Sequence, residues 1–257
     1  MKLSKYTSNF YESVADRADV ASEAIFSIFF RAIKVASIKD IGCGNGIWLR
    51  QTLEIGSVKN RIGYDLPSAL ESAAPFSNKD IVFNEINLES KNYDFMSTDL
   101  ALCLEVAEHV SSESAVRLIE SICRSSKYVI FSAATPGQGG YNHINERSFN
   151  YWVSLFEANG FVGFDVFREK IQQDHRIPFF YRNNVFLFIE LNVYKNTYSS
   201  LNDKFLNFEE MSSESEIKDY RSNLQLFSSF IISKLNFKLV NSLSIIKYRL
   251  NSVMNKK

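Results

Sequence analysis

The sequence lacks an excess of charge, paired cysteines and a long uncharged apolar run. Its 29 basic and 29 acidic residues cancel, so the total charge does not draw the protein to nucleic acid. Cys43, Cys103 and Cys123 have no paired or metal-ligand spacing, so we expect no disulfide framework and a reducing compartment. No run reaches the roughly 20 uncharged residues of a membrane-spanning helix, and no apolar signal core follows Met1. These absences predict a cytoplasmic protein.

What the sequence does contain is a glycine-rich turn between an apolar strand and a helix. Gly42, Gly44 and Gly46 alternate with other residues there, and glycine lets the backbone approach a ligand closely. A second strand-like run ends at Asp65, at the distance where nucleotide-binding units grip ribose hydroxyls. The Gly-x-Gly-x-Gly spacing differs from the Gly-x-Gly-x-x-Gly of dinucleotide sites. It favours S-adenosylmethionine, which has a ribose and an amino acid moiety but no phosphate.

Strand-like and helical segments alternate along most of the chain. This alternation predicts an α/β fold with a mainly parallel sheet that helices cover on both faces. Strands are expected at residues 38–41, 61–64, 81–84, 100–104, 128–131, 161–167 and 185–194, and helices at 8–37, 113–124 and 149–159. Gly160 marks the end of the last of these helices. The final two strands have no clear helix between them, which predicts an antiparallel hairpin at the sheet edge.

Between about residues 35 and 190 the chain resembles the class I S-adenosylmethionine-dependent methyltransferases. The resemblance rests on the glycine loop, Asp65, the segment 99–110 and the strand 128–132. It implies a Rossmann-like, seven-stranded, mainly parallel sheet in a domain of residues 1–194, with residues 8–37 as a helical cap. It also implies that the first loop holds the methionine moiety and that Asp65 holds the ribose. Asn87 stands where the family often has an Asp that recognises the adenine amine. The cofactor-binding residues expected from this resemblance are Asp40, Gly42, Cys43, Gly44, Asp65, Leu66, Asn87, Leu88 and Leu104.

A Glu-x-x-Glu-His cluster, formed by Glu105, Glu108 and His109, follows the fourth strand. If the chain is helical there, these side chains share one face. With His143 downstream, the cluster is similar to the metal site of the ubiquinone-pathway O-methyltransferases and the small-RNA terminal 2′-O-methyltransferases. That likeness implies Mg²⁺ or Mn²⁺ held by all four residues, lowering the pKa of an acceptor hydroxyl. The alternative is a site without metal, in which His109 or His143 is the catalytic base.

The loop at residues 134–146 and the segment 180–184 look like those of a bacterial methyltransferase subgroup associated with surface-polysaccharide and small-molecule pathways. They would form an acceptor pocket in which aromatic rings stack on a sugar and polar side chains bind its hydroxyls. Taken singly, each aromatic is more often a core residue in a chain with 22 phenylalanines. The substrate-binding candidates are Gln138, Tyr141, Asn145, Tyr151, Trp152, Arg182 and Asn183.

Residues 195–257 depart from the catalytic pattern. After Asp219 there are seven basic residues and no acidic one, interleaved with apolar residues. This pattern predicts a helical amphipathic extension that binds an anionic inner-membrane surface or a glycan-assembly partner. Packing against its own domain, or against a second copy in a homodimer, is an equally open alternative.

The sequence as a whole predicts an S-adenosylmethionine-dependent O-methyltransferase that acts on a hydroxyl of a sugar or surface glycan and does not bind nucleic acid. One alternative is methylation of a catechol-like or other small metabolite. Another is a cofactor-binding scaffold in a polysaccharide assembly complex, without catalysis.

Overall fold

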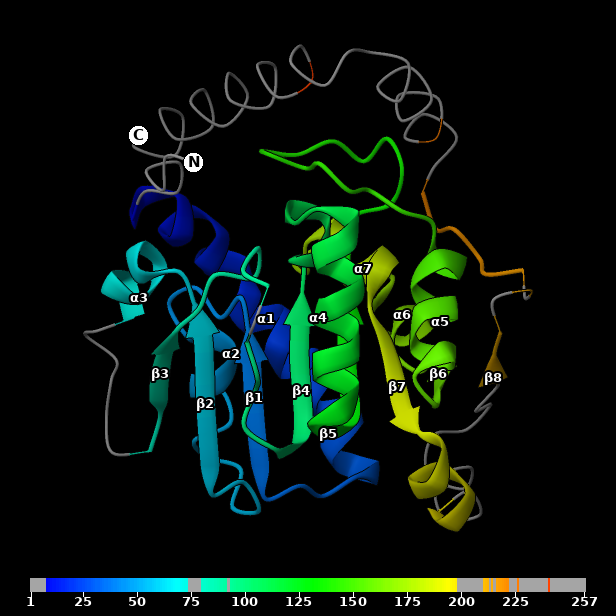
Figure 1. Cartoon of the computed structure of the whole chain (residues 1–257), viewed down its shortest axis with the longest axis horizontal. Coiled ribbons are helices and arrows are strands. Elements are labelled where there is room, and N and C mark those ends of the chain that lie inside the picture. The colour runs from blue at the N-terminus through cyan, green and yellow to red at the C-terminus, as the bar shows by residue number, and fades with distance from the viewer. Residues whose placement is uncertain are drawn as a thin grey trace.

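The computed structural model of the protein describes residues 8–73, 80–91, 93–197, 210–212, 214, 216–221, 226 and 240. Within this part, one sheet has the strand order β3-β2-β1-β4-β5-β7-β6-β8 (Figure 1). The strands are β1 (Ser37–Ile41), β2 (Asn60–Asp65), β3 (Val82–Glu85), β4 (Thr98–Leu104), β5 (Ser126–Ser132), β6 (Phe161–Phe164), β7 (Phe186–Glu190) and β8 (Glu210–Met211).

The first five strands run parallel to one another, whereas β7 is antiparallel to both β5 and β6. The predicted mainly parallel sheet with an antiparallel edge is therefore confirmed. The sheet has one strand more than the seven expected, since β8 pairs with β6. The sixth and seventh strands are shorter than predicted, since the chain leaves the sheet at Phe164 and residues 191–197 are helical.

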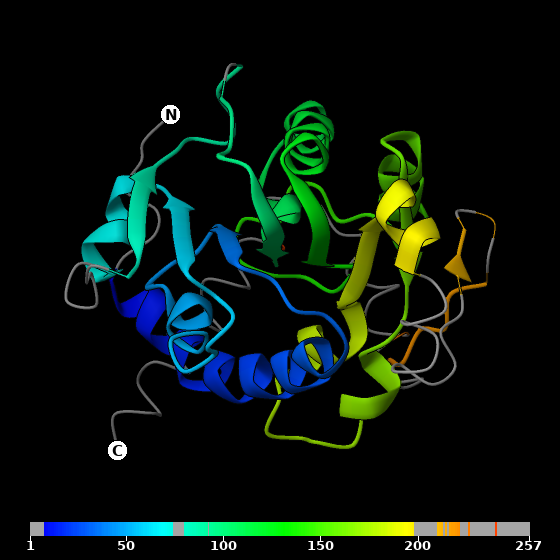
Figure 2. The same ribbon diagram turned by 90° about the horizontal axis from the view of Figure 1, so that it is seen from below.

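Helices cover both faces of the sheet, as Figure 2 shows with α1 on one side and α4 on the other. The helices are α1 (Ser8–Ala32), α2 (Ile47–Arg50), α3 (Pro67–Ala73), α4 (Ser112–Arg124), α5 (Phe149–Ala158), α6 (Arg168–Ile171) and α7 (Phe179–Asn184), with a 3₁₀ turn η2 (Ala107–His109). The first helix ends five residues earlier than predicted, because residues 33–36 lead the chain into β1. Gly160, with a φ of 77°, ends α5 as predicted.

Alternating side chains along the central strands divide the core into two layers. Leu102 of β4 packs with Ile25 and Phe29 of α1 on one face. On the other face, Cys103 packs with Leu118 of α4 and with α5. Both faces of these strands are therefore buried, which is why they read as continuous apolar runs. The sheet is fixed from both sides, and its carboxyl edge becomes a rigid base for loops.

The buried Arg168 joins part of the C-terminal segment to the domain. Its guanidinium lies against the rings of Phe149, Phe186 and Tyr220 and donates hydrogen bonds to the carbonyls of Asn183 and Lys218. Contacts with the sheet and its helices thus continue past the predicted boundary at residue 194. Most of the predicted amphipathic extension, including nearly all of residues 222–257, falls outside the described residues.

None of the helices in the described ranges is both long enough and apolar enough to cross a bilayer. The cysteines at positions 43, 103 and 123 are all free thiols.

Candidate active site

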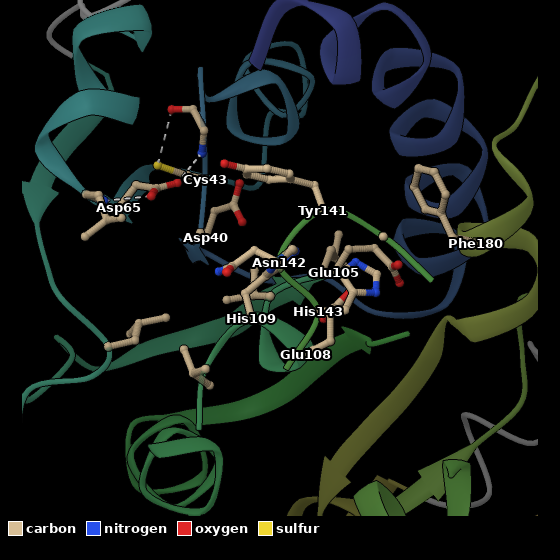
Figure 3. A pocket seen from close by; sticks show the side chains of 18 of the residues that line it. Asp40, Cys43, Asp65, Glu105, Glu108, His109, Tyr141, Asn142, His143 and Phe180 are labelled. Carbon is tan, nitrogen blue, oxygen red and sulfur yellow. Dashed lines mark hydrogen bonds between the residues drawn. The ribbon is translucent and has the colours of Figure 1, made fainter. Parts of the chain in front are cut away.

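A cavity of about 610 Å³ lies beyond the carboxyl ends of β1, β2 and β4. Figure 3 shows Cys43 and Asp65 at one end of this pocket, with Glu108, His109 and His143 grouped away from them. Ligands of open α/β sheets bind at this edge. All nine residues predicted to bind the cofactor line the cavity: Asp40, Gly42, Cys43, Gly44, Asp65, Leu66, Asn87, Leu88 and Leu104.

The glycine loop takes its shape from positive φ angles and from one carboxylate. Gly42 and Gly44 have φ angles of 75° and 53°, and a Cβ at position 42 would overlap Val106 Cγ2. Asp65 Oδ2 accepts a hydrogen bond of 2.7 Å from the Gly44 amide, and its Oδ1 accepts one from the Leu66 amide. Asp65 therefore ties the loop after β1 to the end of β2. Its remaining lone pairs are available to a ligand in the cavity.

Asp40 is the other carboxyl group at this end of the cavity. It is 2% exposed, and its Oδ2 has no hydrogen-bond partner in the described part of the chain. Burial, together with the nearby charge of Asp65, raises the pKa of Asp40 to about 8. Burial also raises the pKa of Asp65 to about 6, against the lowering effect of its two backbone hydrogen bonds. An unpartnered buried oxygen facing a cavity is costly unless a ligand satisfies it, so Asp40 fits a polar group of a cofactor.

Asn87 lies in the cavity wall after β3, with its side chain exposed. Its Oδ1 accepts a hydrogen bond of 3.0 Å from the Glu89 amide. An amide oxygen has two lone pairs, so one remains for the predicted adenine contact.

At the end of β4, Glu105 is held by amides from two distant segments. It has a φ of 56°, an unusual angle for a residue with a side chain. Its carboxyl group accepts hydrogen bonds from Gln138 Nε2 at 3.4 Å and from Asn184 Nδ2 at 3.3 Å. Asn184 also donates to Gln138 Oε1 at 3.0 Å. Burial raises the pKa of Glu105, and the hydrogen bonds from Ser132, Asn184 and Gln138 oppose that rise.

Glu108, His109 and His143 form a compact cluster in the turn after β4. Each offers one ligand atom, and these atoms lie within 4.8 Å of one another. The two imidazole rings meet edge to face with centroids 4.9 Å apart. Burial, followed by the charge of His143, lowers the pKa of His109 to about 3. Glu105 is outside this group of three, unlike in the predicted four-residue set.

Neither carboxyl oxygen of Glu108 has a well-formed hydrogen bond to any described residue. Burial raises the pKa of Glu108 well above its usual value, and the neighbouring Glu105 adds to the rise. Such a buried acid is stabilised by losing its charge or by meeting a cation. Two imidazole nitrogens and one carboxylate suit Mn²⁺ or Fe²⁺ better than Ca²⁺, and Mg²⁺ takes such a site only with added water or hydroxyl ligands.

The loop between β5 and α5 brings His143 to this cluster. Ile144 and Asn145 donate their amides to the Glu108 carbonyl at 2.9 and 3.1 Å. Asn145 Nδ2 also donates to the Ala107 carbonyl at 3.2 Å. These three bonds fasten the loop to η2, so that Tyr141 and His143 line the cavity. In Figure 1 the loop crosses above the carboxyl ends of the central strands.

A family model described as a methyltransferase domain matches residues 15–175, more than half of the chain. The chain belongs to this methyltransferase family. The predicted class of enzyme is therefore confirmed. No curated protein matches the chain by sequence.

Solved structures support the fold of this methyltransferase. An O-methyltransferase family protein from Burkholderia thailandensis superposes with a TM-score of 0.53 at 14% identity, over 70% of this chain and 59% of that one. Human N-acetylserotonin methyltransferase, solved with S-adenosylmethionine, superposes with a TM-score of 0.53 at 16% identity, over 70% of this chain and 55% of that one. The methyltransferase domain of a bacterial Hen1 protein superposes with a TM-score of 0.52 at 19% identity, over 67% of this chain and 98% of that one. The methyltransferase thus spans less than two thirds of the first two of these chains. The family and the shared fold support S-adenosylmethionine as its cofactor.

Two of the seven predicted acceptor residues, Gln138 and Tyr141, line the cavity of the methyltransferase. The others lie elsewhere. Trp152 is 2% exposed and packs on Phe131 in the core, while Tyr151 packs on Trp152 and on the Arg147 guanidinium. Neither ring lines this cavity, because α5 directs Trp152 into the core and Tyr151 is half-buried beside it. Their stacking on a sugar stays a prediction that these contacts do not support.

The three polar residues outside the cavity wall, Asn145, Arg182 and Asn183, have structural partners. Asn145 fastens the loop to η2. Arg182 donates to the carbonyls of Ile177 and Gln172. Asn183 is fully buried and accepts a hydrogen bond of 2.8 Å from the Tyr220 amide. These three side chains hold loops and helices in place, and none lines the cavity.

Sequence reasoning missed several residues that do line the cavity or contact its wall. Trp48 follows the glycine loop, and its indole meets the Tyr181 ring edge to face with centroids 5.4 Å apart. Phe180 also lines the wall. Trp48 stood next to a recognised motif and Phe180 stood in a recognised segment, so both positions were visible in the sequence. The role of Asn184 was not, because its partner Glu105 is 79 positions away.

Proposed function

We propose that the protein is a cytoplasmic O-methyltransferase that transfers a methyl group from S-adenosylmethionine to a hydroxyl of a sugar or glycan. The observation that carries this proposal is the cluster of Glu108, His109 and His143 in the same cavity as the glycine loop and Asp65. Methyl transfer to oxygen requires an acceptor hydroxyl aligned with the methyl group and a means of removing its proton. The cofactor end of the cavity would hold the methyl donor, and the cluster would remove the proton of the acceptor hydroxyl.

In the metal-free form of the mechanism, His143 or His109 accepts the hydroxyl proton while the hydroxyl oxygen forms its bond to the methyl carbon. S-adenosylmethionine supplies that carbon, and its sulfur keeps the electron pair of the broken carbon–sulfur bond. Glu105, held by Gln138 and Asn184, adds a fixed carboxyl group to the lining of the same cavity. We assign the base to His143 first, because burial lowers the pKa of His109 to about 3 and makes its imidazole a weaker base.

In the metal-assisted form, Glu108, His109 and His143 would hold a divalent ion. Their spacing, and the lack of a well-formed hydrogen bond to either Glu108 oxygen from the described residues, fit such an ion. A bound ion would lower the pKa of a hydroxyl that coordinates it. Mn²⁺, or Mg²⁺ with water ligands, is the ion proposed here.

The acceptor is proposed from the lining of the cavity. Gln138 and Tyr141 offer polar groups near the cluster, and Trp48, Phe180 and Tyr181 provide an aromatic wall. Sugars bind by this combination of hydroxyl contacts and ring stacking. The same aromatic wall favours a second candidate, a catechol-like or other small aromatic metabolite. A neutral total charge argues against RNA.

The test is methyl transfer from radiolabelled S-adenosylmethionine to three acceptor classes: bacterial polysaccharide fragments, catechols and a short RNA. Each reaction is run after exhaustive chelation and again with Mg²⁺ or Mn²⁺ restored. The proposal expects label in the polysaccharide fragments, in a base-stable ether. Label in catechols alone favours the second candidate, and no transfer to any hydroxyl overturns the proposal. Full activity after chelation removes the metal-assisted form and leaves His143 as the base.

We also propose that the C-terminal residues bring the enzyme to a membrane or glycan-assembly partner. The support is the one-sided charge of the sequence after Asp219. Because Arg221 donates to the Pro136 carbonyl at 3.0 Å, the test should remove residues 227–257 and keep residue 221. The truncated enzyme should methylate a soluble acceptor at the full rate and a vesicle-bound acceptor more slowly. Loss of both activities, or conversion of a dimer to a monomer, would favour the alternative of packing against the domain or a second copy.

A further inference from the structure

Glu146 lies behind His143, on the loop between β5 and α5, and accepts hydrogen bonds from three nitrogens. Its Oε2 accepts the Gly137 amide at 2.8 Å. Its Oε1 accepts the Gly139 amide at 2.8 Å and lies 2.9 Å from His143 Nδ1. The two glycines have φ angles of 75° and 68°, which turn their amides toward one carboxylate. Glu146 therefore shapes the loop and contacts the imidazole with the same group.

The two hydrogen bonds from backbone amides to Glu146 indicate which atom is the donor in the hydrogen bond between Glu146 and His143. Both oxygens of Glu146 already act as acceptors of N–H groups, and a carboxylate can only accept. His143 Nδ1 must then be the donor, so the proton of the neutral imidazole is on Nδ1. The lone pair of the ring is left on Nε2.

Gly140 controls the other edge of the same ring. A Cβ at position 140 would overlap Nε2 and Cε1 of His143. The φ of Gly140 is not in the left-handed region, so the backbone conformation does not require glycine there. Glycine is required because a side chain would occupy the space of the His143 ring. The imidazole is thus bound at Nδ1 by the Glu146 carboxylate, and the lack of a side chain at Gly140 leaves room for its Nε2 edge.

We propose that Glu146 is a positioning residue that fixes His143 in the tautomer with its proton on Nδ1 and its Nε2 lone pair free for chemistry in the cavity. A carboxylate behind a histidine plays this part in catalytic triads and in metal sites, where it sets ring orientation and tautomer. The importance of the lone pair for turnover rests on the proposed function. The tautomer itself does not, because the hydrogen bonds of Glu146 determine it.

The first test is a long-range ¹H–¹⁵N spectrum of the full-length wild-type protein without ligands, which distinguishes a protonated ring nitrogen from a bare one. The chain has three histidines, His109, His143 and His175, and His143→Asn assigns the signal. Above the pH at which the ring loses its second proton, the proposal expects a protonated Nδ1 and a bare Nε2. Glu146→Gln should change this signal to the other tautomer or to a mixture. A proton on Nε2 in the wild type would overturn the proposal.

The second test is kinetic and uses two variants that disturb the ring from opposite sides. Glu146→Gln should lower kcat roughly 10- to 100-fold, the usual cost of losing a partner behind a functional histidine. Gly140→Ala should also lower kcat, because its Cβ would displace the His143 ring. The KM for S-adenosylmethionine should stay within about twofold, because the cofactor end is untouched. Glu113→Gln, at an exposed carboxylate on α4, is the matched control and should leave kcat and KM unchanged.

The outcomes separate the positioning role from the proposed function. Glu146→Gln also removes an acceptor from the loop, so unfolding midpoints are measured for every variant, and Gly140→Ala gives an answer with Glu146 intact. Unchanged kcat in both variants would overturn the positioning role in turnover. The expected tautomer together with a fully active His143→Ala enzyme would uphold the position of the ring and reject His143 as base or ligand, and with it that part of the proposed function.

Discussion

The two ends of the cavity are built in different ways. At the cofactor end, Asp65 bonds to a glycine amide only 21 positions earlier. At the acceptor end, Glu105 bonds to Asn184 across 79 positions, and His143 reaches Glu108 through a loop fastened to η2. The cofactor end is formed within one strand–turn–helix–strand unit, whereas the acceptor end is formed by three segments that are far apart in the sequence. We expect the first end to control cofactor affinity and the second to control the rate of transfer.

The largest expected effect is at the acceptor end. His143→Ala should lower kcat roughly 10²- to 10⁴-fold, the usual contribution of a general base, with S-adenosylmethionine affinity unchanged within about twofold. His175→Ala, at an exposed histidine outside the cavity, is the control and should behave as wild type. Steady-state kinetics and calorimetry measure the two quantities. A His143→Ala enzyme with normal kcat would place proton removal elsewhere.

At the cofactor end, Asp65→Ala should weaken S-adenosylmethionine binding. A hydrogen bond to a charged group contributes about 1.5–3 kcal/mol, so losing the ribose contact raises Kd by roughly 10- to 100-fold, and loosening the Gly44 amide adds to it. The kcat at saturating cofactor should change much less. Asp94→Ala is the control, since that carboxylate is 91% exposed. Undiminished affinity in calorimetry would refute the role of Asp65.

A smaller effect tests why the turn needs glycine. Gly42→Ala should destabilise the protein by about 1–2 kcal/mol from its positive φ, plus a steric cost against Val106. Adding Val106→Ala should relieve the steric part and leave the backbone part. Denaturant unfolding measures both, with Gly56→Ala as control, because no atom lies within 4 Å of a Cβ there. If the second substitution restored full stability, backbone strain would have no role.

The last effect is on the pH dependence of stability in the cofactor-free protein. The pKa of Asp40 is raised from 3.8 to about 8 in the folded state. Between these values the unfolded chain releases a proton that the folded chain keeps, so the free energy of unfolding falls as pH rises through this window. Asp40→Asn removes this titration. The Tm of the variant minus that of the wild type should therefore increase from pH 5 to pH 8. A constant difference would show that Asp40 is ionised in the folded protein.

The same contrast explains what the sequence could predict. The glycine loop and Asp65 were predictable because local backbone geometry dictates both. The core position of Trp152 was also visible, since Phe149, Trp152, Val153 and Phe156 share one helical face. The roles of Asn184 and Glu146 could not be predicted, because they depend on where α7 and a long loop come to rest. Likewise, β8 joins the sheet through the pairing of Met211 with Gly163 of β6, two residues that are 48 positions apart.

The most direct test of the two-ended cavity is the rate of methyl transfer to a glycan acceptor as a function of S-adenosylmethionine concentration, measured for wild type, Asp65→Ala and His143→Ala. We predict that saturating cofactor restores Asp65→Ala to near the wild-type rate, and that no concentration restores His143→Ala. Recovery of His143→Ala at high cofactor concentration, with Asp65→Ala remaining slow, would contradict the division of the site.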